Sequence, residues 1–395
     1  MAHAGEAELP QSAIPQTDGL RGLVGLLAAW IVVLLAGASP TTGAALLVVG
    51  AALPMLAAEV SRVGPVRGDD MPRPWQHPAA WTLGFAVAMS PFLALFWSFW
   101  GGAYWLMACL VVAPAFTLRW VIEARRGYAW AGRALPLRLG LALLRWDHGA
   151  LRRLGEPARQ WAIKAFFVPL YGLGLSFCVW SVSEAWAAGA WLTAAVFFGW
   201  SIDAAFGLAS YVFASDGLGA GTRSTQRAPL GWLVCLVCYP PFWFAWPEFA
   251  GVLLHENKWP TAVAGLPGWA AAAMLAVQAL YVSATVAMGL RFANLSSRGL
   301  IAHGPYRLMK HPMYFGHVTF AWMTVLVVLP LGGVAPVPAT LLAAAGITLA
   351  YRLRATTEEA HLSEDPEYRR YAEWIAEHGL LARIKRAVLI RPKVA

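Results

Sequence analysis

Charged side chains are scarce in this sequence. They make up 13% of the 395 residues, whereas hydrophobic residues make up 59% and the mean hydropathy is +0.55. Because a soluble domain carries about 25% charged residues, this composition excludes an ordinary soluble protein and predicts an integral membrane protein. The net charge of +9 therefore reports membrane topology rather than binding to nucleic acid.

Cysteine is also rare. Cys109, Cys178, Cys235 and Cys238 all lie in apolar runs, which excludes a disulfide framework. The last two form a CxxC pair, but no second pair and no nearby histidine accompanies it, so no metal site is predicted. The first twenty residues contain no basic segment ahead of an apolar core, so no cleaved signal peptide is expected.

Long apolar runs, by contrast, dominate the chain. About ten of them approach the roughly 20 residues that a bilayer span requires. They cover residues 22–38, 41–59, 79–98, 102–118, 163–182, 187–213, 230–248, 268–290, 312–330 and 336–351. The predicted fold is therefore all-α, a polytopic transmembrane helix bundle.

Basic residues are distributed unevenly between the two faces that these spans define. Of the 30 Lys and Arg residues, all but Lys258 fall on one face, together with both termini. The positive-inside rule predicts that this face is cytoplasmic. Within its largest connector, residues 135–146 are amphipathic and either anchor the topology or recognise anionic headgroups. High Ala, Gly, Trp and Arg content indicates a GC-rich bacterium, and hence a bacterial cytoplasmic membrane.

Two polar or helix-breaking features interrupt the apolar runs. Asp203 lies deep in the sixth run, where a carboxylate is costly, so it is expected to have either a function or a hydrogen-bond partner on a neighbouring helix. Pro240 and Pro241 are expected to break the seventh run, which either opens a substrate cavity or serves packing.

A polar connector, residues 291–314, separates the eighth and ninth runs and reads RFANLSSRGLIAHGPYRLMKHPMY. Pro312 fits the first turn of the ninth helix, which places His311 near the N-cap and Tyr314 on roughly the same side. The free backbone N–H groups and the positive end of the helix dipole at this point suit an anion. The alternative is an ordinary basic loop followed by a proline-capped span.

A second polar stretch, residues 352–374, follows the last apolar run. Arg354 and Glu358 are four residues apart, so they share a face if the helix continues. Thr356 and Glu359 instead fit a capping box, which would start a new helix here. Tyr368, Tyr371, Trp374, Ile375 and Leu381 then recur at helical spacing and predict an amphipathic interfacial helix on the cytoplasmic surface.

The two stretches together carry a family resemblance. The order RGL-x-x-x-GPYR-x-x-KHP-x-Y, apolar hairpin, R-x-x-x-EE-x-x-L, Y-x-x-Y resembles the isoprenylcysteine carboxyl methyltransferase and phospholipid methyltransferase group of membrane enzymes. The likeness covers roughly residues 287–386. It implies an S-adenosylmethionine-dependent methyltransferase whose acceptor is lipidic or lipid-linked and carries a carboxylate, amine or thiol. It also divides the chain into an N-terminal bundle with a basic loop (1–160), middle transmembrane helices (161–267) and a methyltransferase-like catalytic region (268–395).

The resemblance also assigns residues. It places the cofactor beside Arg298, Gly299, Leu300, Ile301, Tyr306, His311, Pro312, Met313, Tyr314 and Glu358. Arg354 would face the acceptor, and we add Asp203 as a substrate-binding candidate. A carboxylate acceptor needs no base, whereas an amine or thiol would need Glu358, Glu359 or His311 to take a proton. Arg354, Glu358 and His311 are therefore the catalytic candidates. One departure is Lys310, where the family usually has Arg.

Two other function classes compete with methyl transfer. An NADPH-dependent membrane sterol-type reductase has a similar C-terminal arrangement and around ten spans, but its pattern usually reads His-Pro-Asn-Tyr, whereas residues 311–317 read HPMYFGH. A transporter is disfavoured because no inverted repeat is visible. The acceptor and the oligomeric state stay open.

Overall fold

The computed structural model is almost entirely helical. It describes residues 8–63, 76–107, 119, 135–213, 215–240, 242, 266–328, 330 and 338–389. Cys109, Lys258 and most of the predicted fourth span lie outside these residues. Five helices in the described part are long and apolar enough to cross a membrane. They are α1 (Gln16–Ala36), α2 (Pro40–Arg62), α7 (Gly155–Ala187), α8 (Trp191–Phe213) and α12 (Gly268–Met288). The predicted all-α, multi-pass membrane bundle is confirmed, whereas the count of ten spans stays a prediction.

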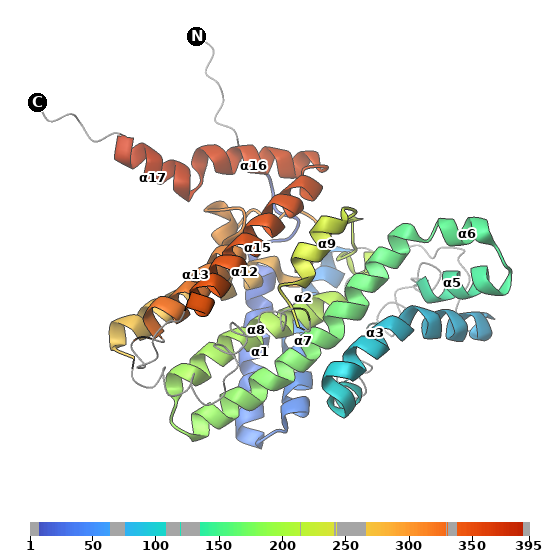
Figure 1. The fold of residues 1–395 in the computed structure, drawn as a ribbon, viewed down its shortest axis with the longest axis horizontal. Coiled ribbons are helices and arrows are strands. Elements are labelled where there is room, and N and C mark those ends of the chain that lie inside the picture. The colour runs from blue at the N-terminus through green and yellow to red at the C-terminus, as the bar shows by residue number, and fades with distance from the viewer. Residues whose placement is uncertain are drawn as a thin grey trace, which may run out of the picture.

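A side lobe is formed by α3 (Pro78–Met107), α5 (Leu135–Leu144) and the short α6 (His148–Arg152), on the right of the bundle in Figure 1. The predicted amphipathic segment is therefore helical over most of its length. The predicted boundary between the third and fourth spans is wrong, because α3 continues unbroken through Gly101 and Gly102. Glycine weakens a helix but does not end it when the flanking sequence stays apolar.

One large core joins the N-terminal and C-terminal parts of the chain. Leu26 and Trp30 of α1, Phe167 of α7 and Tyr211 of α8 are buried together with Phe292, which follows the 3₁₀ turn η6 (Gly289–Arg291). The rings of Phe167 and Tyr211 stack with centroids 5.3 Å apart. The loop after α12 is therefore packed directly against α1, α7 and α8.

The C-terminal helices complete the bundle and cross its end (Figure 1). They are α13 (Pro312–Met323), its π-helical continuation η8 (Thr324–Val328), α15 (Pro338–Leu362), α16 (Pro366–His378) and α17 (Leu380–Leu389). As predicted, Pro312 begins its helix. The capping box is not used to start a helix, because α15 continues through Thr356, whose hydroxyl donates to the Arg352 carbonyl at 3.0 Å.

A two-stranded antiparallel ladder connects the middle of the chain to the polar connector. In it β1 (Ser224–Thr225) pairs with β2 (Ser296–Ser297). The short helix α9 (Pro229–Leu236) follows β1 and ends four residues before Pro240. This agrees with the predicted break in the seventh run. The ladder brings a segment from outside the predicted catalytic region beside residues 291–298.

Candidate functional site

Arg354 is the buried cation of the site. Its side chain is 5% exposed, and its guanidinium lies 5.3, 4.8 and 5.7 Å from the ring centroids of Tyr239, Tyr314 and Tyr351. The guanidinium donates to the Tyr239 hydroxyl at 3.3 Å and to the amide oxygen of Asn294. None of these described partners is a carboxylate. A desolvated guanidinium whose described hydrogen-bond partners are neutral is suited to binding an anionic group.

Asn294 connects this cation to α7 and α8. Its backbone N–H donates to the Tyr211 hydroxyl at 2.6 Å, and its side-chain amide donates to the Tyr171 hydroxyl at 3.3 Å. Its amide oxygen accepts from Arg354 and from Tyr239. Helices α7 and α8 therefore fix the position of the Arg354 guanidinium through a single buried amide.

Glu358 lies one turn after Arg354 on α15 and accepts a hydrogen bond from the Tyr314 hydroxyl. The Tyr314 ring stacks on His311 with centroids 5.1 Å apart and an interplanar angle of 3°. The predicted sharing of one helix face by Arg354 and Glu358 is therefore present. Both residues also lie against the first turn of α13, since Tyr314 of that turn contacts each of them.

Glu359 makes a different set of contacts. It accepts from Lys310, and the Nε2 atom of His311 lies 2.9 Å from its Oε1 atom. Burial acts to raise the pKa of Glu359, but the hydrogen bonds from His311 and Lys310 outweigh it and lower the pKa to about 2. This carboxylate therefore clamps the start of α13 to α15. Lys310 supplies the positive charge at the position where the methyltransferase family that the motifs resemble usually has Arg.

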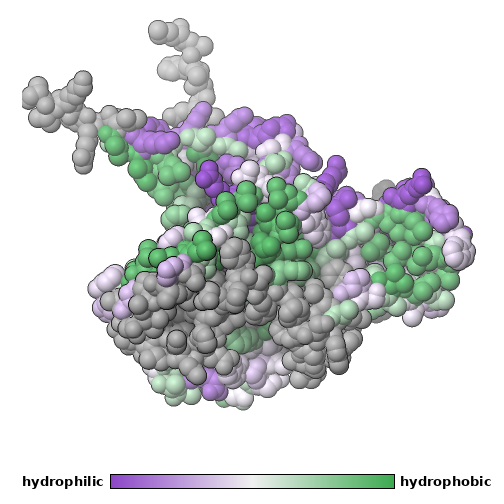
Figure 2. Space-filling view, in the orientation of Figure 1, coloured by the Kyte–Doolittle hydropathy of each residue, from purple (hydrophilic) through white to green (hydrophobic). Residues whose placement is uncertain are grey.

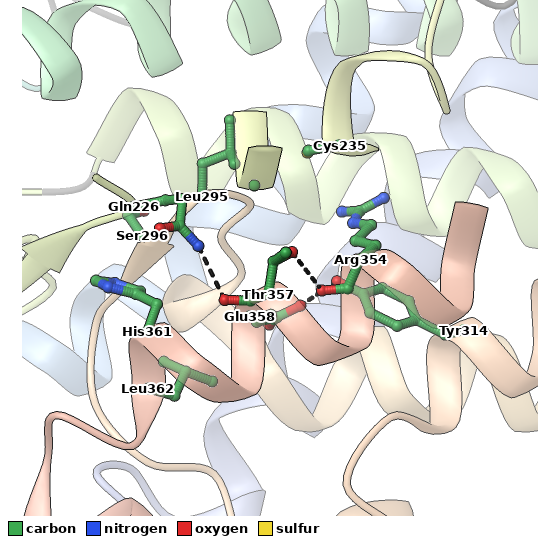
Figure 3. Close-up of a pocket in the computed structure, with 11 residues that line it drawn as sticks. Gln226, Cys235, Leu295, Ser296, Tyr314, Arg354, Thr357, Glu358, His361 and Leu362 are labelled. Carbon is green, nitrogen blue, oxygen red and sulfur yellow. Dashed lines mark hydrogen bonds between the residues drawn. The ribbon is translucent and has the colours of Figure 1, made fainter. Parts of the chain in front are cut away.

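A pocket opens beside Arg354 and Glu358 (Figure 3). It is lined by Gln226, Gly231, Cys235, Leu295, Ser296, Tyr314, Arg354, Thr357, Glu358, His361 and Leu362. Three of the predicted site residues are thus brought together in its wall. Sequence reasoning missed the others, although His361 was detectable, since it shares a helix face with Arg354 and Glu358 at spacings of seven and three residues.

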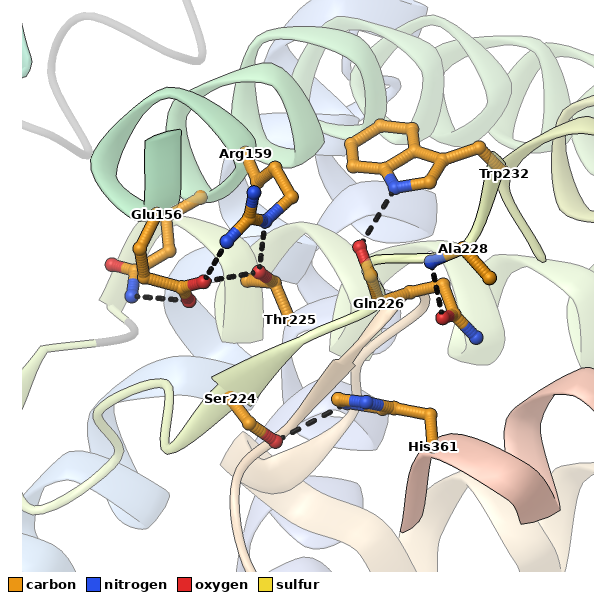
Figure 4. Close-up of polar contacts among 9 residues, drawn as sticks. Glu156, Arg159, Ser224, Thr225, Gln226, Ala228, Trp232 and His361 are labelled. Atoms are coloured by element: carbon orange, nitrogen blue, oxygen red, sulfur yellow. Dashed lines mark hydrogen bonds and ion pairs between the residues drawn. The ribbon is translucent and has the colours of Figure 1, made fainter. Parts of the chain in front are cut away.

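The part of the pocket wall that Gln226 forms is held by polar contacts of β1 and of Gln226, the residue that follows it (Figure 4). Gln226 donates to the Thr357 carbonyl at 2.9 Å, and the Ser224 hydroxyl lies 3.2 Å from Nε2 of His361. Burial lowers the pKa of His361, which favours its neutral form. Thr225 donates to Glu156 at 2.8 Å, which ties the same strand to α7.

The predicted cofactor loop, residues 298–301, is held from behind by the start of the chain. The Ala13 N–H donates to the Leu300 carbonyl at 2.7 Å, and the Ser12 hydroxyl accepts from the Ala302 N–H at 2.7 Å. Arg298 is buried and donates to the Ser210 and Phe292 carbonyls at 3.1 and 2.7 Å. Its side chain thus fixes the loop to α8.

The other predicted cofactor residues also lie outside the pocket wall. The side chains of Leu300 and Ile301 are both 8% exposed, and Gly299 has a φ of +108°, which an L side chain rarely adopts. The carbonyl of Tyr306, in the 3₁₀ turn η7 (Gly304–Arg307), accepts from the Tyr371 hydroxyl at 2.7 Å. Pro312 is buried at the start of α13.

Of the two alternatives expected for Asp203, a function or a hydrogen-bond partner on a neighbouring helix, the structure shows the partner. Asp203 is 9% exposed, and its carboxylate accepts a hydrogen bond from the Thr285 hydroxyl of α12 at 2.7 Å. The Thr285 oxygen lies 4.0 Å from the sulfur of Met313 in the first turn of α13. Asp203 is therefore connected to the helix that carries His311 and Tyr314, without lining the pocket itself.

Chemically, the site offers one buried cation, one carboxylate and a helix start. No side chain in the described part of the chain caps α13, since His311 occupies the N-cap without a capping bond. The first-turn N–H groups therefore remain available to an anion or carbonyl group.

Comparison with known proteins yields one finding. The model of the phospholipid methyltransferase family matches residues 249–366, and the C-terminal part of the chain is thus similar to that family, as the motifs predict. No curated protein and no solved structure matches the chain. The matched range contains Tyr314, Arg354 and Glu358, whereas Gln226 and Cys235 of the pocket wall precede it.

Proposed function

We propose, taking the similarity of residues 249–366 to the phospholipid methyltransferase family as premise, that the protein transfers a methyl group from S-adenosylmethionine to a lipidic or lipid-linked acceptor. The observation that carries this proposal is that three motif residues of the matched range, Tyr314, Arg354 and Glu358, line one pocket. Tyr314 comes from α13, and Arg354 and Glu358 come from α15. The proposed site requires that residues of these two helices lie together.

S-adenosylmethionine would supply a sulfonium-bound methyl group with a good leaving group, so the protein's task is alignment. Glu358 would bind the ammonium or a ribose hydroxyl of the cofactor. The first turn of α13, from His311 to Tyr314, would line the site, and residues 298–301 with Tyr306 would support it from behind. Tyr314 would orient Glu358 through the hydrogen bond it already donates.

Arg354 would position the acceptor. Its guanidinium is buried and its described partners are neutral, which suits an acceptor carboxylate or the phosphate of a lipid. A carboxylate would attack directly as the anion. For an amine or thiol acceptor, Glu358 is the candidate base, because Glu359 and His311 already bind each other.

The reaction would take place on the cytoplasmic side of the membrane. Hydrophilic residues gather along the upper edge of the molecule, over α16, α17 and α6, and hydrophobic residues are visible directly below them (Figure 2). This is the edge on which the Lys and Arg distribution predicts the cytoplasm. The site residues Lys310 and Glu359 lie near the same end of the bundle, and a bacterial cytoplasmic membrane is the proposed location.

Calorimetric titration of the purified, detergent-solubilised protein tests the donor. We expect S-adenosylhomocysteine to bind with micromolar affinity and NADPH not to bind. Binding of NADPH alone would overturn the proposal in favour of a sterol-type reductase. Binding of neither ligand would reject both enzyme classes.

A further inference from the structure

The two C-terminal helices carry the same amphipathic pattern but differ in what covers their apolar faces. In α16 the apolar residues are buried in the protein: Tyr368, Tyr371, Trp374 and Ile375 are between 1% and 8% exposed. In α17 they are not: Leu381, Ile384 and Val388 are 74%, 49% and 64% exposed. These three residues recur at helical spacing, so they form one face. No other part of the described chain covers that face.

The charges of α17 also differ from those of α16. Arg383, Lys385 and Arg386 lie within the ten residues of α17, which contain no acidic residue. The thirteen residues of α16 contain three glutamates and two arginines. In Figure 2, α17 at the upper left shows hydrophobic atoms below, toward the level of the membrane helices, and hydrophilic atoms along the outer edge.

We propose that α17 lies in the headgroup region of an anionic lipid leaflet and that its seating there orders the cofactor site. The exposed apolar face, the excess of basic charge and the direction of the apolar face all fit this occupant. Because the spanning helices hold the molecule in a bilayer, the leaflet is always present beside α17. The lipid's headgroup charge then decides how firmly the helix is seated.

The contacts between α17 and the site run through a short loop. The Leu380 N–H donates to the Leu308 carbonyl at 2.8 Å. A Cβ atom on Gly379 would lie 3.0 Å from the same carbonyl, so α16 and α17 join in close contact with this loop. Together with the bond from Tyr371 to the Tyr306 carbonyl, these contacts hold the segment that leads into Lys310 and His311.

The experiment uses the full-length protein in nanodiscs of phosphatidylcholine alone or with about 30% phosphatidylglycerol. Hydrogen exchange of residues 380–389 reports whether α17 is seated. The affinity for S-adenosylhomocysteine reports whether the site responds, and this second readout rests on the proposed function. We expect slower exchange and an affinity about fivefold higher with the anionic lipid. Lys385→Glu should remove both effects.

Arg370→Glu is the matched control. It reverses an exposed basic charge on α16, whose apolar face is buried, and should leave both lipid responses unchanged. Equal exchange of α17 in the two lipids would overturn the seating on anionic lipid. Slower exchange without a change in affinity would overturn the coupling to the site. Absence of S-adenosylhomocysteine binding in either lipid would instead reject the proposed function, and the exchange data would still decide the seating of α17.

Discussion

Two adjacent glutamates on α15 have different partners and therefore different proposed roles. Glu359 is bound by Lys310 and His311, whereas the described partner of Glu358 is the neutral hydroxyl of Tyr314. A carboxylate that has already been neutralised by protein cations contributes little to ligand binding. Glu358 has no basic partner among the described residues, and it is therefore the one available to a cofactor ammonium.

Replacement of Glu358 by glutamine should weaken S-adenosylhomocysteine binding by about tenfold to hundredfold, because a charge-assisted hydrogen bond becomes a neutral one. Titration calorimetry measures the loss, and the thermal midpoint in detergent should change little. Glu364→Gln is the control, since Glu364 is exposed in the turn that follows the same helix. Unchanged affinity in the Glu358 variant would remove this residue from the cofactor site.

Replacement of Glu359 by glutamine should instead lower thermal stability in a pH-dependent way. The folded protein lowers the pKa of Glu359 from 4.5 to about 2, so its contribution is complete above about pH 4.5 and is lost as the pH falls toward 2. The difference in melting temperature between wild type and variant should therefore be constant near neutrality and narrow below pH 4.5. A difference that does not depend on pH would contradict the ionic clamp.

The site residues that the sequence could predict are those whose spacing along a helix fixes their direction. Arg354 and Glu358 share a face because the helix continues, and Pro312 marks the start of α13. The role of Arg298 could not be read in this way, because its partners are the carbonyls of Ser210 and Phe292. Such contacts depend on tertiary packing and leave no local pattern.

At the scale of elements, the loop before α13 depends on a backbone conformation that only glycine adopts easily. Gly299 has a φ of +108°, and a Cβ atom there would lie 2.7 Å from the Cβ atom of Ala13. Gly299→Ala should therefore destabilise the protein by about 1–3 kcal/mol and weaken cofactor binding as the loop shifts. Melting in detergent and calorimetry check both effects.

Gly174→Ala serves as the control for this substitution. Gly174 lies inside α7 with no atom near its virtual Cβ position, so alanine should be neutral or slightly stabilising there. Equal behaviour of the two alanine variants would show that the loop accommodates a side chain at residue 299.

Helix boundaries were predictable where a strong local signal exists and not elsewhere. Pro312 starts α13, and α9 ends before the Pro240–Pro241 pair, as the sequence indicates. The capping box of Thr356 and Glu359 does not start a helix, because Glu359 is bound by Lys310 and His311 and α15 continues through both box residues. The glycines at 101 and 102 likewise did not end α3, since apolar residues flank them.

At the scale of the whole molecule, the part of the chain that precedes the family-matched range takes part in building the site. Asn294 binds Tyr171 and Tyr211 of α7 and α8, and Gln226 and Cys235 line the pocket. Neither wall residue belongs to the family-matched range. The division of the chain into three regions stays a prediction, and α7, α8 and the residues after α12 share one core across its boundaries. We therefore propose that the additional helices shape the acceptor side of the pocket.

A substitution at Asp203 tests whether these additional helices influence the methyl transfer reaction. Its carboxylate holds Thr285, which contacts the first turn of α13 through Met313. Asp203→Asn keeps an acceptor oxygen but removes the charge, so cofactor affinity should stay within about twofold while methyl transfer falls by about tenfold or more as the turn shifts. Ser201→Ala is the control, because Ser201 lies on the same helix and instead accepts from Trp30. Calorimetry and a turnover assay on the same preparations separate the two effects. Wild-type turnover in the Asp203 variant would confine α8 to a supporting role, and loss of cofactor binding would move Asp203 to the donor side of the site.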